Sequence, residues 1–383
     1  MTIEQWYSEN FEDRLAGRYL PISRVLSVLK SYGNSFEIFS IGESELGIDI
    51  PCWKIGNGKK VVLGWSQMHG NESTTTKALV DFLKFVTNEE YFQDEIEQFL
   101  GNYTFYVVPV LNPDGAKAYT RENANGIDLN RDAVDLSQSE SRALSELFQM
   151  VQPELCLNLH DQRTIYGLLK KNPATISFLS PAANSQLSVT PARKEAMKMI
   201  VGMNKMLQKK IPSCVGRYDD SFNPNCVGDT FQAKGIPTIL FEAGHFPNDY
   251  EREKTRELIF YAYVELFQIF QQDEKNLDDR DYFKIPENHN KMRDVVLRNV
   301  KINNDPTPVS IVIQYQEELN EGRVEFVPII ENIGKLEEYF GHVEIDVQGA
   351  EILLNSYENV FVNEKVSIIV DKYAENRIFF KYS

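Results

Sequence analysis

Short apolar runs alternate with longer amphipathic stretches from about residue 40 to about residue 270. The apolar runs predict buried strands, and four of them are VVLGWSQ (61–67), YTFYVVPVL (103–111), ELCLNL (154–159) and PTILF (237–241). The amphipathic stretches predict helices, among them residues 73–88, 139–151 and 191–210. Because strands that alternate with helices form sheets covered on both faces, this pattern predicts an α/β domain with a largely parallel sheet.

The composition of the chain changes after about residue 272. Residues 271–294 are polar and charged, which is typical of a linker. Runs rich in β-branched and aromatic residues follow at 309–316, 323–330, 342–349, 366–373 and 377–383. With the turn residues between them, they predict a small β-rich, sandwich-like module of about 100 residues. We therefore expect an α/β domain at residues 1–272, and a linker with a β-rich accessory domain at 273–383.

The chain is acidic, with a formal net charge of −16 over 383 residues and no Lys/Arg-rich run. A nucleic-acid partner requires a basic patch that neutralises phosphates, so this balance argues against one. Nowhere do about 18 apolar residues run together, and the first residues do not have the basic and apolar regions of a signal peptide. We therefore expect no membrane span and a cytoplasmic location, whereas the oligomeric state is not indicated.

The four cysteines, Cys52, Cys156, Cys214 and Cys226, form no CxxC motif. Two of them lie in apolar runs that predict strands. We interpret them as buried thiols rather than as a disulfide framework. Cys214 and Cys226 share a loop, so the alternative is that they pair in an oxidising compartment.

Four of the predicted strands run into polar residues that bind metals or move protons in other proteins: His69, Asn112, His160 and Glu242. In open α/β sheets, ligands bind outside the carboxyl ends of the strands. The four strand ends therefore predict one functional site at that edge of the sheet. Asn112, in the motif NPDG, is also a common turn residue and is the least specific of the four.

The predicted metal ligands are His69, Glu72 and His160. A catalytic zinc commonly takes two His and one carboxylate and leaves a position for water. His69 and Glu72 lie three residues apart, so one turn would deliver both, and His160 at a different strand end would complete the set. Taken alone, HxxE is a weak signal, because Glu72 would equally be explained as a carboxylate at a helix N-terminus, stabilised by the helix dipole. The set of three, together with the other strand ends, carries the prediction.

Five motifs occur in the order and spacing found in zinc metallocarboxypeptidases of the carboxypeptidase A type, the M14 peptidase family. They are HGNE (69–72), NPDG (112–115), RENANGIDLNRD (121–132), NLHDQ (158–162) and ILFEAG (239–244). The resemblance covers roughly residues 40 to 270. It implies a mixed, mostly parallel eight-stranded sheet flanked by helices, one zinc ion per chain, and a catalytic role for the α/β domain. The β-rich tail resembles the accessory sandwich that some members carry, although no motif establishes that match.

The resemblance also implies roles for the matching residues. His69, Glu72 and His160 resemble the zinc ligands, and Glu242 resembles the general base that activates the zinc-bound water. These roles agree with elementary chemistry, because zinc lowers the pKa of its water to about 7 and a nearby carboxylate is able to pass the proton to the leaving amine. The alternative for Glu242 is a buried structural carboxylate.

Four further roles follow from the same resemblance. Arg121 resembles the arginine that polarises the scissile carbonyl, where a fixed positive charge stabilises the oxyanion. Asn130 and Arg131 resemble the pair that receives the terminal carboxylate of the substrate, which a planar guanidinium binds with two hydrogen bonds. Asp128 resembles the carboxylate that orients the first His ligand. Tyr218 resembles the mobile tyrosine that closes over the substrate. The alternatives are surface charges for Arg121, Asp128 and Arg131, and an ordinary loop residue for Tyr218.

Two residues depart from the common pattern of the family. Asp132 stands where the family commonly has Asn, and it would add a negative charge near the carboxylate pocket. That charge would weaken the binding of an ordinary C-terminus or favour a substrate with an amine nearby. Arg163 follows His160 closely and would offer a second recognition point for an anionic group.

The predicted function is zinc-dependent hydrolysis of the C-terminal peptide bond of peptides with a free carboxylate. The alternative is a related zinc amidohydrolase, such as a murein-peptide amidase that cleaves γ-D-glutamyl-diaminopimelate or an N-acyl-amino-acid deacylase. The long block at 112–132 favours the peptidase over the deacylase. A non-catalytic binding module is disfavoured, because the ligand set is complete and Glu242 and Arg121 are both present. The side chain preferred at the cleaved position is not indicated.

Overall fold

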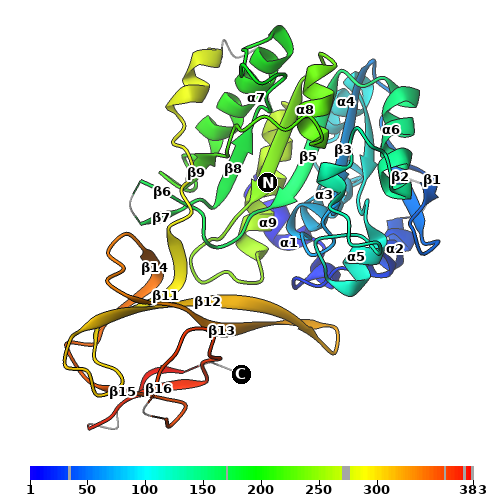
Figure 1. Cartoon of the computed structure of the whole chain (residues 1–383). Coiled ribbons are helices and arrows are strands. Elements are labelled where there is room, and N and C mark those ends of the chain that lie inside the picture. The colour runs from blue at the N-terminus through cyan, green and yellow to red at the C-terminus, as the bar shows by residue number, and fades with distance from the viewer. Residues whose placement is uncertain (33–35, 170, 270–276, 358, 374–376, 381–383) are drawn as a thin grey trace. The chain divides into compact units, whose positions relative to one another are not determined.

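The computed structural model describes residues 1–32, 36–169, 171–269, 277–357, 359–373 and 377–380 (Figure 1). The chain divides into two compact units. Unit 1 comprises Met1–Gln162 and Ala174–Asn288, and unit 2 comprises Arg163–Pro173 and His289–Ser383. The first part of the expected linker, residues 271–276, and the end of the last expected strand, residues 381–383, lie outside the described residues.

Unit 1 contains an eight-stranded sheet in the order β1-β2-β4-β3-β5-β10-β8-β9 (Figure 1). Its strands are β1 (Glu37–Glu43), β2 (Asp49–Ile55), β3 (Lys60–Ser66), β4 (Tyr103–Val108), β5 (Leu155–Asp161), β8 (Ile176–Leu179), β9 (Val215–Arg217) and β10 (Thr238–Ala243). The four central strands, β4, β3, β5 and β10, run parallel to one another, as do β8 and β9. The pairs β1–β2, β2–β4 and β8–β10 are antiparallel. This arrangement confirms the predicted mixed, mostly parallel eight-stranded sheet.

Helices cover both faces of this sheet. They are α1 (Ile3–Asn10), α2 (Ile22–Leu29), α3 (Thr74–Val86), α4 (Gln93–Asn102), α5 (Pro113–Ala118), α6 (Ser139–Val151), α7 (Pro191–Leu207), α8 (Val227–Ala233) and α9 (Glu253–Leu266). Successive residues of a strand point to opposite faces. Along β5, Cys156 packs in the core with α6 and α8, whereas Leu157 and Leu159 pack in the core with α3, α7 and α9. Burial on both faces explains why the strands appear in the sequence as unbroken apolar runs.

A buried ion pair joins α3 to α9 on one face of the sheet. Arg256 Nε and Nη2 each donate to one carboxylate oxygen of Asp81, and both donor–acceptor distances are 2.6 Å. Both side chains are fully buried. The same carboxylate accepts hydrogen bonds from the Tyr7 hydroxyl (3.0 Å) and the Glu12 backbone N–H (2.8 Å). The N-terminal segment is thereby tied to α3, the helix whose first turn lies at the predicted metal site.

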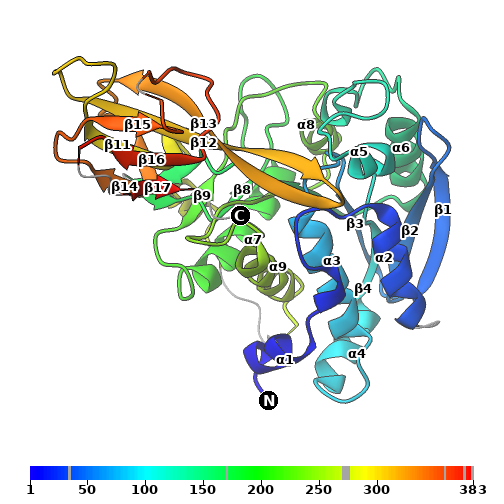
Figure 2. The same cartoon turned by 90° about the horizontal axis from the view of Figure 1, so that it is seen from below.

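Unit 2 consists of β-sheets (Figures 1 and 2). A four-stranded sheet has the order β13-β12-β11-β14, and a three-stranded sheet has the order β15-β16-β17. The strands are β11 (Met292–Val300), β12 (Val309–Asn320), β13 (Arg323–Gly334), β14 (Phe340–Asp346), β15 (Ile352–Leu354), β16 (Ile368–Asp371) and β17 (Arg377–Phe380). One core joins the two sheets, since Leu297 and Ile313 of the first cluster with Leu354 and Ile369 of the second. The predicted β-rich region is confirmed.

The boundaries of the units differ from the expected cut at residues 272 and 273. Residues 277–288 belong to unit 1, where Tyr282 is fully buried in its core. Residues 163–173 belong to unit 2, although they lie within the α/β part of the sequence. They form the short strands β6 (Gly167–Leu168) and β7 (Asn172–Pro173), and Gly167 exchanges two 2.9 Å backbone hydrogen bonds with His289. A pattern of apolar positions does not reveal such a pairing, because its two sides are far apart in the chain.

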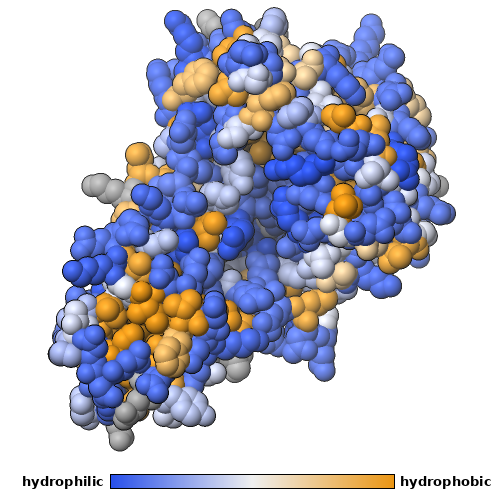
Figure 3. Space-filling view, in the orientation of Figure 1, coloured by the Kyte–Doolittle hydropathy of each residue, from blue (hydrophilic) through white to orange (hydrophobic). Residues whose placement is uncertain are grey.

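The surface of unit 1 visible in Figure 3 is mainly hydrophilic, in keeping with the acidic composition. Among the described residues, no helix has both the length and the apolar character needed to cross a bilayer.

All four cysteines are free thiols: Cys52 and Cys156 are buried, as predicted, whereas Cys214 and Cys226 are half-buried.

Candidate metal and active site

The turn between β3 and α3 carries two of the predicted ligands, His69 and Glu72. Gly70, between them, passes directly over α5: a Cβ at this position would lie 1.9 Å from the carbonyl carbon of Gly115. Only glycine allows this approach. Asn112 supports the same contact, since its side-chain oxygen accepts from Gly115 N–H (2.8 Å) and its amide donates to the carbonyl of the residue before His69 (3.2 Å). The motif NPDG therefore contributes structure to the turn that presents the ligands.

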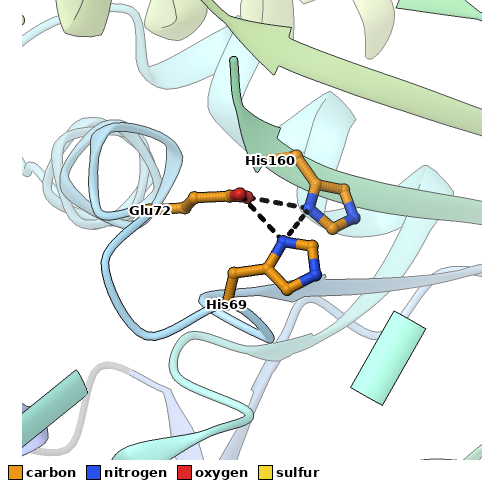
Figure 4. Close-up of side chains that lie close together, drawn as sticks. All are labelled: His69, Glu72 and His160. Carbon is orange, nitrogen blue, oxygen red and sulfur yellow. Dashed lines mark hydrogen bonds and ion pairs between the residues drawn. The ribbon is translucent and has the colours of Figure 1, made fainter. Parts of the chain in front are cut away.

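The three predicted ligands meet in one buried cluster (Figure 4). His69 Nδ1 lies 2.8 Å from Glu72 Oε1, and His160 Nδ1 lies 2.8 Å from Glu72 Oε2. The two Nδ1 atoms are 3.1 Å apart. All candidate ligand atoms lie within 4.8 Å of one another. His160 comes from the end of β5, so the cluster joins the ends of two neighbouring parallel strands.

The chemistry of these atoms fits a cation. His69 Nε2 lies 3.0 Å from Asp128 Oδ1, an arrangement in which the ring N–H donates to the carboxylate and the lone pair of Nδ1 faces the cluster. His160 Nε2 is buried and has no hydrogen-bond partner in the described part of the chain, which leaves Nδ1 as the ring nitrogen directed at Glu72. Two imidazole nitrogens and a carboxylate directed at one point are the donor set that zinc takes in catalytic sites.

The electrostatics of the cluster keep Glu72 ionised. Burial raises the pKa of Glu72, but the adjacent imidazoles of His69 and His160 outweigh burial, and the net pKa is well below its ordinary range. Burial lowers the pKa of His160 overall. For His69, burial also acts to lower the pKa, but Glu72 and Asp128 raise it more. Metal ligands must be deprotonated, so the lowered pKa values of Glu72 and His160 suit the binding of a metal ion, whereas the raised pKa of His69 means that a metal ion would displace a proton there.

Arg121 and Asp128 lie at the edge of the cluster. Arg121 donates to Asp128 Oδ2 through Nε (3.2 Å) and Nη2 (3.0 Å), while its Nη1 lies 3.2 Å from His69 Nδ1 and 3.3 Å from Glu72 Oε1. Burial acts to raise the pKa of Asp128, but the hydrogen bond with His69 and the charge of Arg121 lower it overall. Asp128 is therefore ionised, and the Arg121 side chain, 42% exposed, faces both solvent and the ligands.

Glu242 lies beside the ligands on the neighbouring strand. It is the register partner of His160 in the parallel pair of β10 and β5, so the two side chains leave the sheet at the same level and on the same face. Its side chain is buried, and Oε2 has no hydrogen-bond partner in the described part of the chain. Burial, followed by the charges of Glu72 and Asp161, raises the pKa of Glu242 well above its ordinary value.

The segment with Asn130 and Arg131 follows Asp128 in a short 3-10 helix, η3 (Leu129–Arg131). The Asp128 side chain caps this helix by accepting from Asn130 N–H (2.9 Å). The Asn130 side-chain oxygen accepts from the N–H of Val227 (3.2 Å), which joins η3 to the start of α8. Arg131 is exposed, and its Nη1 donates to the carbonyl of Asn130 (2.7 Å).

Asp132 does not present a free charge. It is buried, and its carboxylate accepts from the backbone N–H groups of Ser137 (3.0 Å) and Gln138 (2.9 Å), just before α6 begins. Burial acts to raise the pKa of Asp132, but these hydrogen bonds lower it overall. The Asp132 carboxylate therefore bonds to the chain ahead of α6 and not to the predicted ligands.

Two residues of interest are not joined to the cluster by the contacts above. Tyr218 directly follows β9, the edge strand two places from β10, and its backbone N–H donates to the carbonyl of Phe178 on β8 (2.9 Å). Its assignment as a mobile tyrosine stays a prediction. Arg163 is exposed and is the first residue of unit 2.

Sequence reasoning missed one residue of the site, Asp161. It is buried directly after His160, its N–H donates to Glu72 Oε2 (3.1 Å), and its carboxylate bonds to Thr74. The signal was present in the motif NLHDQ, where a second acidic side chain follows a predicted ligand at the end of a strand.

The comparisons with known proteins agree with this geometry. Residues 22–166 match the zinc carboxypeptidase family of M14 peptidases, a range that contains the three predicted ligands and ends before Glu242. Carboxypeptidase SOL1 of Arabidopsis thaliana is 30% identical over 154 residues, which are 36% of this chain and 29% of that protein. The match thus spans less than a third of the length of that relative.

Solved structures show the fold. The metallo-carboxypeptidase from Burkholderia cenocepacia aligns with a TM-score of 0.52 at 16% identity, covering 65% of this chain and 70% of that chain. Carboxypeptidase A from Helicoverpa armigera aligns with a TM-score of 0.51 at 16% identity, covering 70% of this chain and 78% of that chain.

Proposed function

We propose that this chain, whose residues 22–166 match the zinc carboxypeptidase family, is a zinc-dependent metallocarboxypeptidase that hydrolyses the C-terminal bond of peptides with a free carboxylate. The observation that carries the proposal is the convergence of His69 Nδ1, the Glu72 carboxylate and His160 Nδ1 within 4.8 Å. The carboxylate of Asp128 behind His69 fits the same purpose, since it directs the lone pair of Nδ1 inward.

His69, Glu72 and His160 would hold the zinc ion. When bound, zinc supplies a Lewis acid that polarises the scissile carbonyl and acidifies a water molecule. The neighbouring imidazoles of His69 and His160 keep the pKa of Glu72 low, and the ionised carboxylate is the form that binds a metal ion.

Glu242 is our candidate for the general base. It lies at the level of His160 on the adjacent strand, and its Oε2 has no hydrogen-bond partner among the described residues. Because burial and the neighbouring charges raise the pKa of Glu242, its carboxylate is a stronger proton acceptor than an exposed one and would pass the proton on to the leaving amine. Arg252 helps to hold this strand end, since its Nη1 donates to the carbonyl of Ala243 (2.6 Å).

Two arginines would bind the substrate. The Nη1 of Arg121 lies beside the ligand atoms of His69 and Glu72, and this supports a role in which its charge would stabilise the carbonyl oxygen of a bound peptide as it becomes negative. The exposed Arg131 would bind the terminal carboxylate together with the amide of Asn130. The hydrogen bonds of Asn130 to Asp128 and Val227 would keep this pair in a fixed orientation.

Substrate profiling with and without chelator tests the proposal. The full chain is assayed on peptides with a free C-terminus, on their C-terminal amides, on muropeptides and on N-acyl amino acids. We expect cleavage of the free peptides alone, loss of this activity with a chelator, and recovery with added zinc. Glu265→Gln, a change on α9 distant in sequence from the site, serves as the control and should behave like the wild type. Cleavage of muropeptides or acyl amino acids in preference to free peptides would contradict the proposed substrate, and chelator-resistant activity would contradict the proposed metal.

A further inference from the structure

We propose that Asp161 is a positioning residue of the metal site: it holds the turn with His69 and Glu72 against the strand that carries His160. The inference rests on the proposed function only for the identity of the ion. It concerns a residue outside the ligand set and outside the group of residues that would contact the substrate.

The backbone and the side chain of Asp161 contact both parts of the ligand turn. Its N–H donates to Glu72 Oε2 (3.1 Å), the same oxygen that lies 2.8 Å from His160 Nδ1. Its carboxylate Oδ2 accepts from the backbone N–H of Thr74 (3.1 Å) and from the Thr74 hydroxyl (2.5 Å). Residue 74 is two positions after Glu72, so Asp161 binds the turn at the ligand itself and immediately beyond it.

The alternation of side chains along β5 explains how Asp161 reaches the start of α3 while His160 faces the other ligands. His160 and Asp161 are adjacent on β5 and point to opposite faces of the sheet. His160 lies level with Glu242, whereas Asp161 lies level with Ala243, which packs in the core that includes α3. The first turn of α3 is therefore within reach of the Asp161 carboxylate but not of the His160 ring.

The carboxylate also supplies a cap that α3 does not have from its own sequence. Ser73, the N-cap residue of α3, makes no side-chain capping bond, because its hydroxyl donates to the carbonyl of Arg18 (2.6 Å). The first N–H groups of a helix have no acceptor within the helix. Asp161 provides one, and a negative charge at this end is also stabilised by the helix dipole.

The surroundings keep Asp161 in place. Arg252 Nη2 donates to the carbonyl of Gln162 (2.9 Å), and Arg252 Nη1 donates to the carbonyl of Ala243 (2.6 Å), so both strand ends are bonded to one guanidinium. Asp161 is only 8% exposed. Burying a carboxylate is costly, and the bonds to Thr74 compensate for part of this cost. Held by these contacts, Asp161 is well placed to fix the distance between Glu72 and His160.

Zinc affinity should therefore depend on Asp161. Removing a residue that orients metal ligands typically weakens metal binding about 10–100-fold. Asp161→Ala keeps the backbone N–H that donates to Glu72 but removes the carboxylate that holds Thr74, so we expect the zinc dissociation constant to rise by the lower end of this range, about 10-fold. Asp161→Asn keeps one carbonyl oxygen that accepts from the N–H and the hydroxyl of Thr74, so this variant should retain most of the zinc affinity of the wild type. Thr74→Val removes the hydroxyl but not the N–H, so its effect should be smaller than that of Asp161→Ala and should nearly vanish in the Asp161→Ala background.

The matched control is Asp249→Ala. Asp249 also caps a helix with its carboxylate, accepting from the backbone N–H groups of Glu253 (2.9 Å), Lys254 (2.9 Å) and Thr255 (3.1 Å) at the start of α9, but it contacts no ligand in these bonds. Both Ala variants should lower the melting temperature of the metal-free protein. Only Asp161→Ala should weaken zinc binding.

The measurement is a zinc titration of the metal-free full chain against a chromophoric chelator, together with melting curves of every variant. An unchanged zinc dissociation constant in Asp161→Ala would overturn the proposal, as would an equal loss in Asp249→Ala. If Asp161→Ala does not fold, Thr74→Val decides, because it removes one of the two hydrogen bonds to the Asp161 carboxylate. An unchanged zinc dissociation constant in Thr74→Val would then overturn the proposal. Failure of the wild type itself to bind zinc would contradict the proposed function instead. A wild type that binds zinc and cleaves peptides, beside variants with unchanged affinity, would contradict only the role of Asp161.

Discussion

Replacing Glu242 with Gln tests the proposed mechanism at a single group. Gln has nearly the size and shape of Glu, so the buried site keeps its packing, but the proton acceptor is removed. Loss of a positioned general base costs about 10²–10⁴-fold in rate, which corresponds to about 3–5 kcal/mol in the activation free energy. Glu242 is not among the three clustered ligands, so zinc affinity should stay within a few-fold of the wild type.

The same substitution should change the stability of the metal-free protein in a direction that the site predicts. Burial and the charges of Glu72 and Asp161 raise the pKa of Glu242 well above its ordinary value of 4.5. Between pH 4.5 and that raised pKa, the folded state keeps a proton that the unfolded chain has released, so the free energy of unfolding falls as the pH rises. The slope for one group is about 1.4 kcal/mol per pH unit. Gln does not ionise, so the metal-free variant does not lose this stability. Above pH 4.5, its free energy of unfolding should therefore exceed that of the wild type by an amount that grows with pH at this slope.

Three measurements on the Glu242→Gln variant test this reasoning together: turnover of a free peptide at saturating zinc, zinc affinity, and urea unfolding of the metal-free protein from pH 4 to pH 8. The wild type and the variant should have similar unfolding curves near pH 4 and should diverge as the pH rises. Turnover of the variant within ten-fold of the wild type would refute the assignment of the base. A difference in stability that does not depend on pH would refute the raised pKa.

Further predictions concern substrate binding, the folded core and the orientation of the first ligand. Arg131→Gln should lower kcat/KM for peptides with a free C-terminus about 10–100-fold, because a charged hydrogen bond contributes about 1.5–3 kcal/mol. The already poor cleavage of C-terminal amides should stay unchanged. Equal losses on both substrates would contradict the role of Arg131. Arg256→Met should lower the free energy of unfolding, measured in urea, by about 3–5 kcal/mol, because it leaves the fully buried Asp81 without its counter-ion. The double variant Asp81→Asn with Arg256→Met should recover part of this loss. Asp128→Ala should weaken zinc binding about 10–100-fold through the freed His69 ring, and titration against a chelator would disprove this if the affinity did not change.

Much of unit 1 is predictable from local sequence patterns. The expected strands and helices correspond to β3, β4, β5, β10, α3, α6 and α7, with ends that differ by a few residues. This success has a physical cause, because a sheet covered on both faces requires unbroken apolar strands and each covering helix requires one apolar side. The resemblance to a family added the remaining strands and the strand number.

Unit 2 was predictable only in outline. The β-rich character of its sequence is plain, but residues 163–173 join it from within the α/β part of the chain. Their pairing with His289 depends on backbone hydrogen bonds, which do not require a particular side-chain pattern.

The sequence by itself determined which residue types stand at the ends of the parallel strands, because strand order along the chain and the positions of polar residues are both local properties. Only the tertiary structure decided which of these residues meet. His69 and His160 are 91 positions apart, and their nitrogens come within 3.1 Å because β3 and β5 are neighbours in the sheet. In the folded chain, the Asp132 carboxylate bonds to the backbone ahead of α6, and the Asp161 carboxylate bonds to the start of α3. Side-chain direction and strand adjacency are set by contacts between distant segments, and no local pattern encodes them.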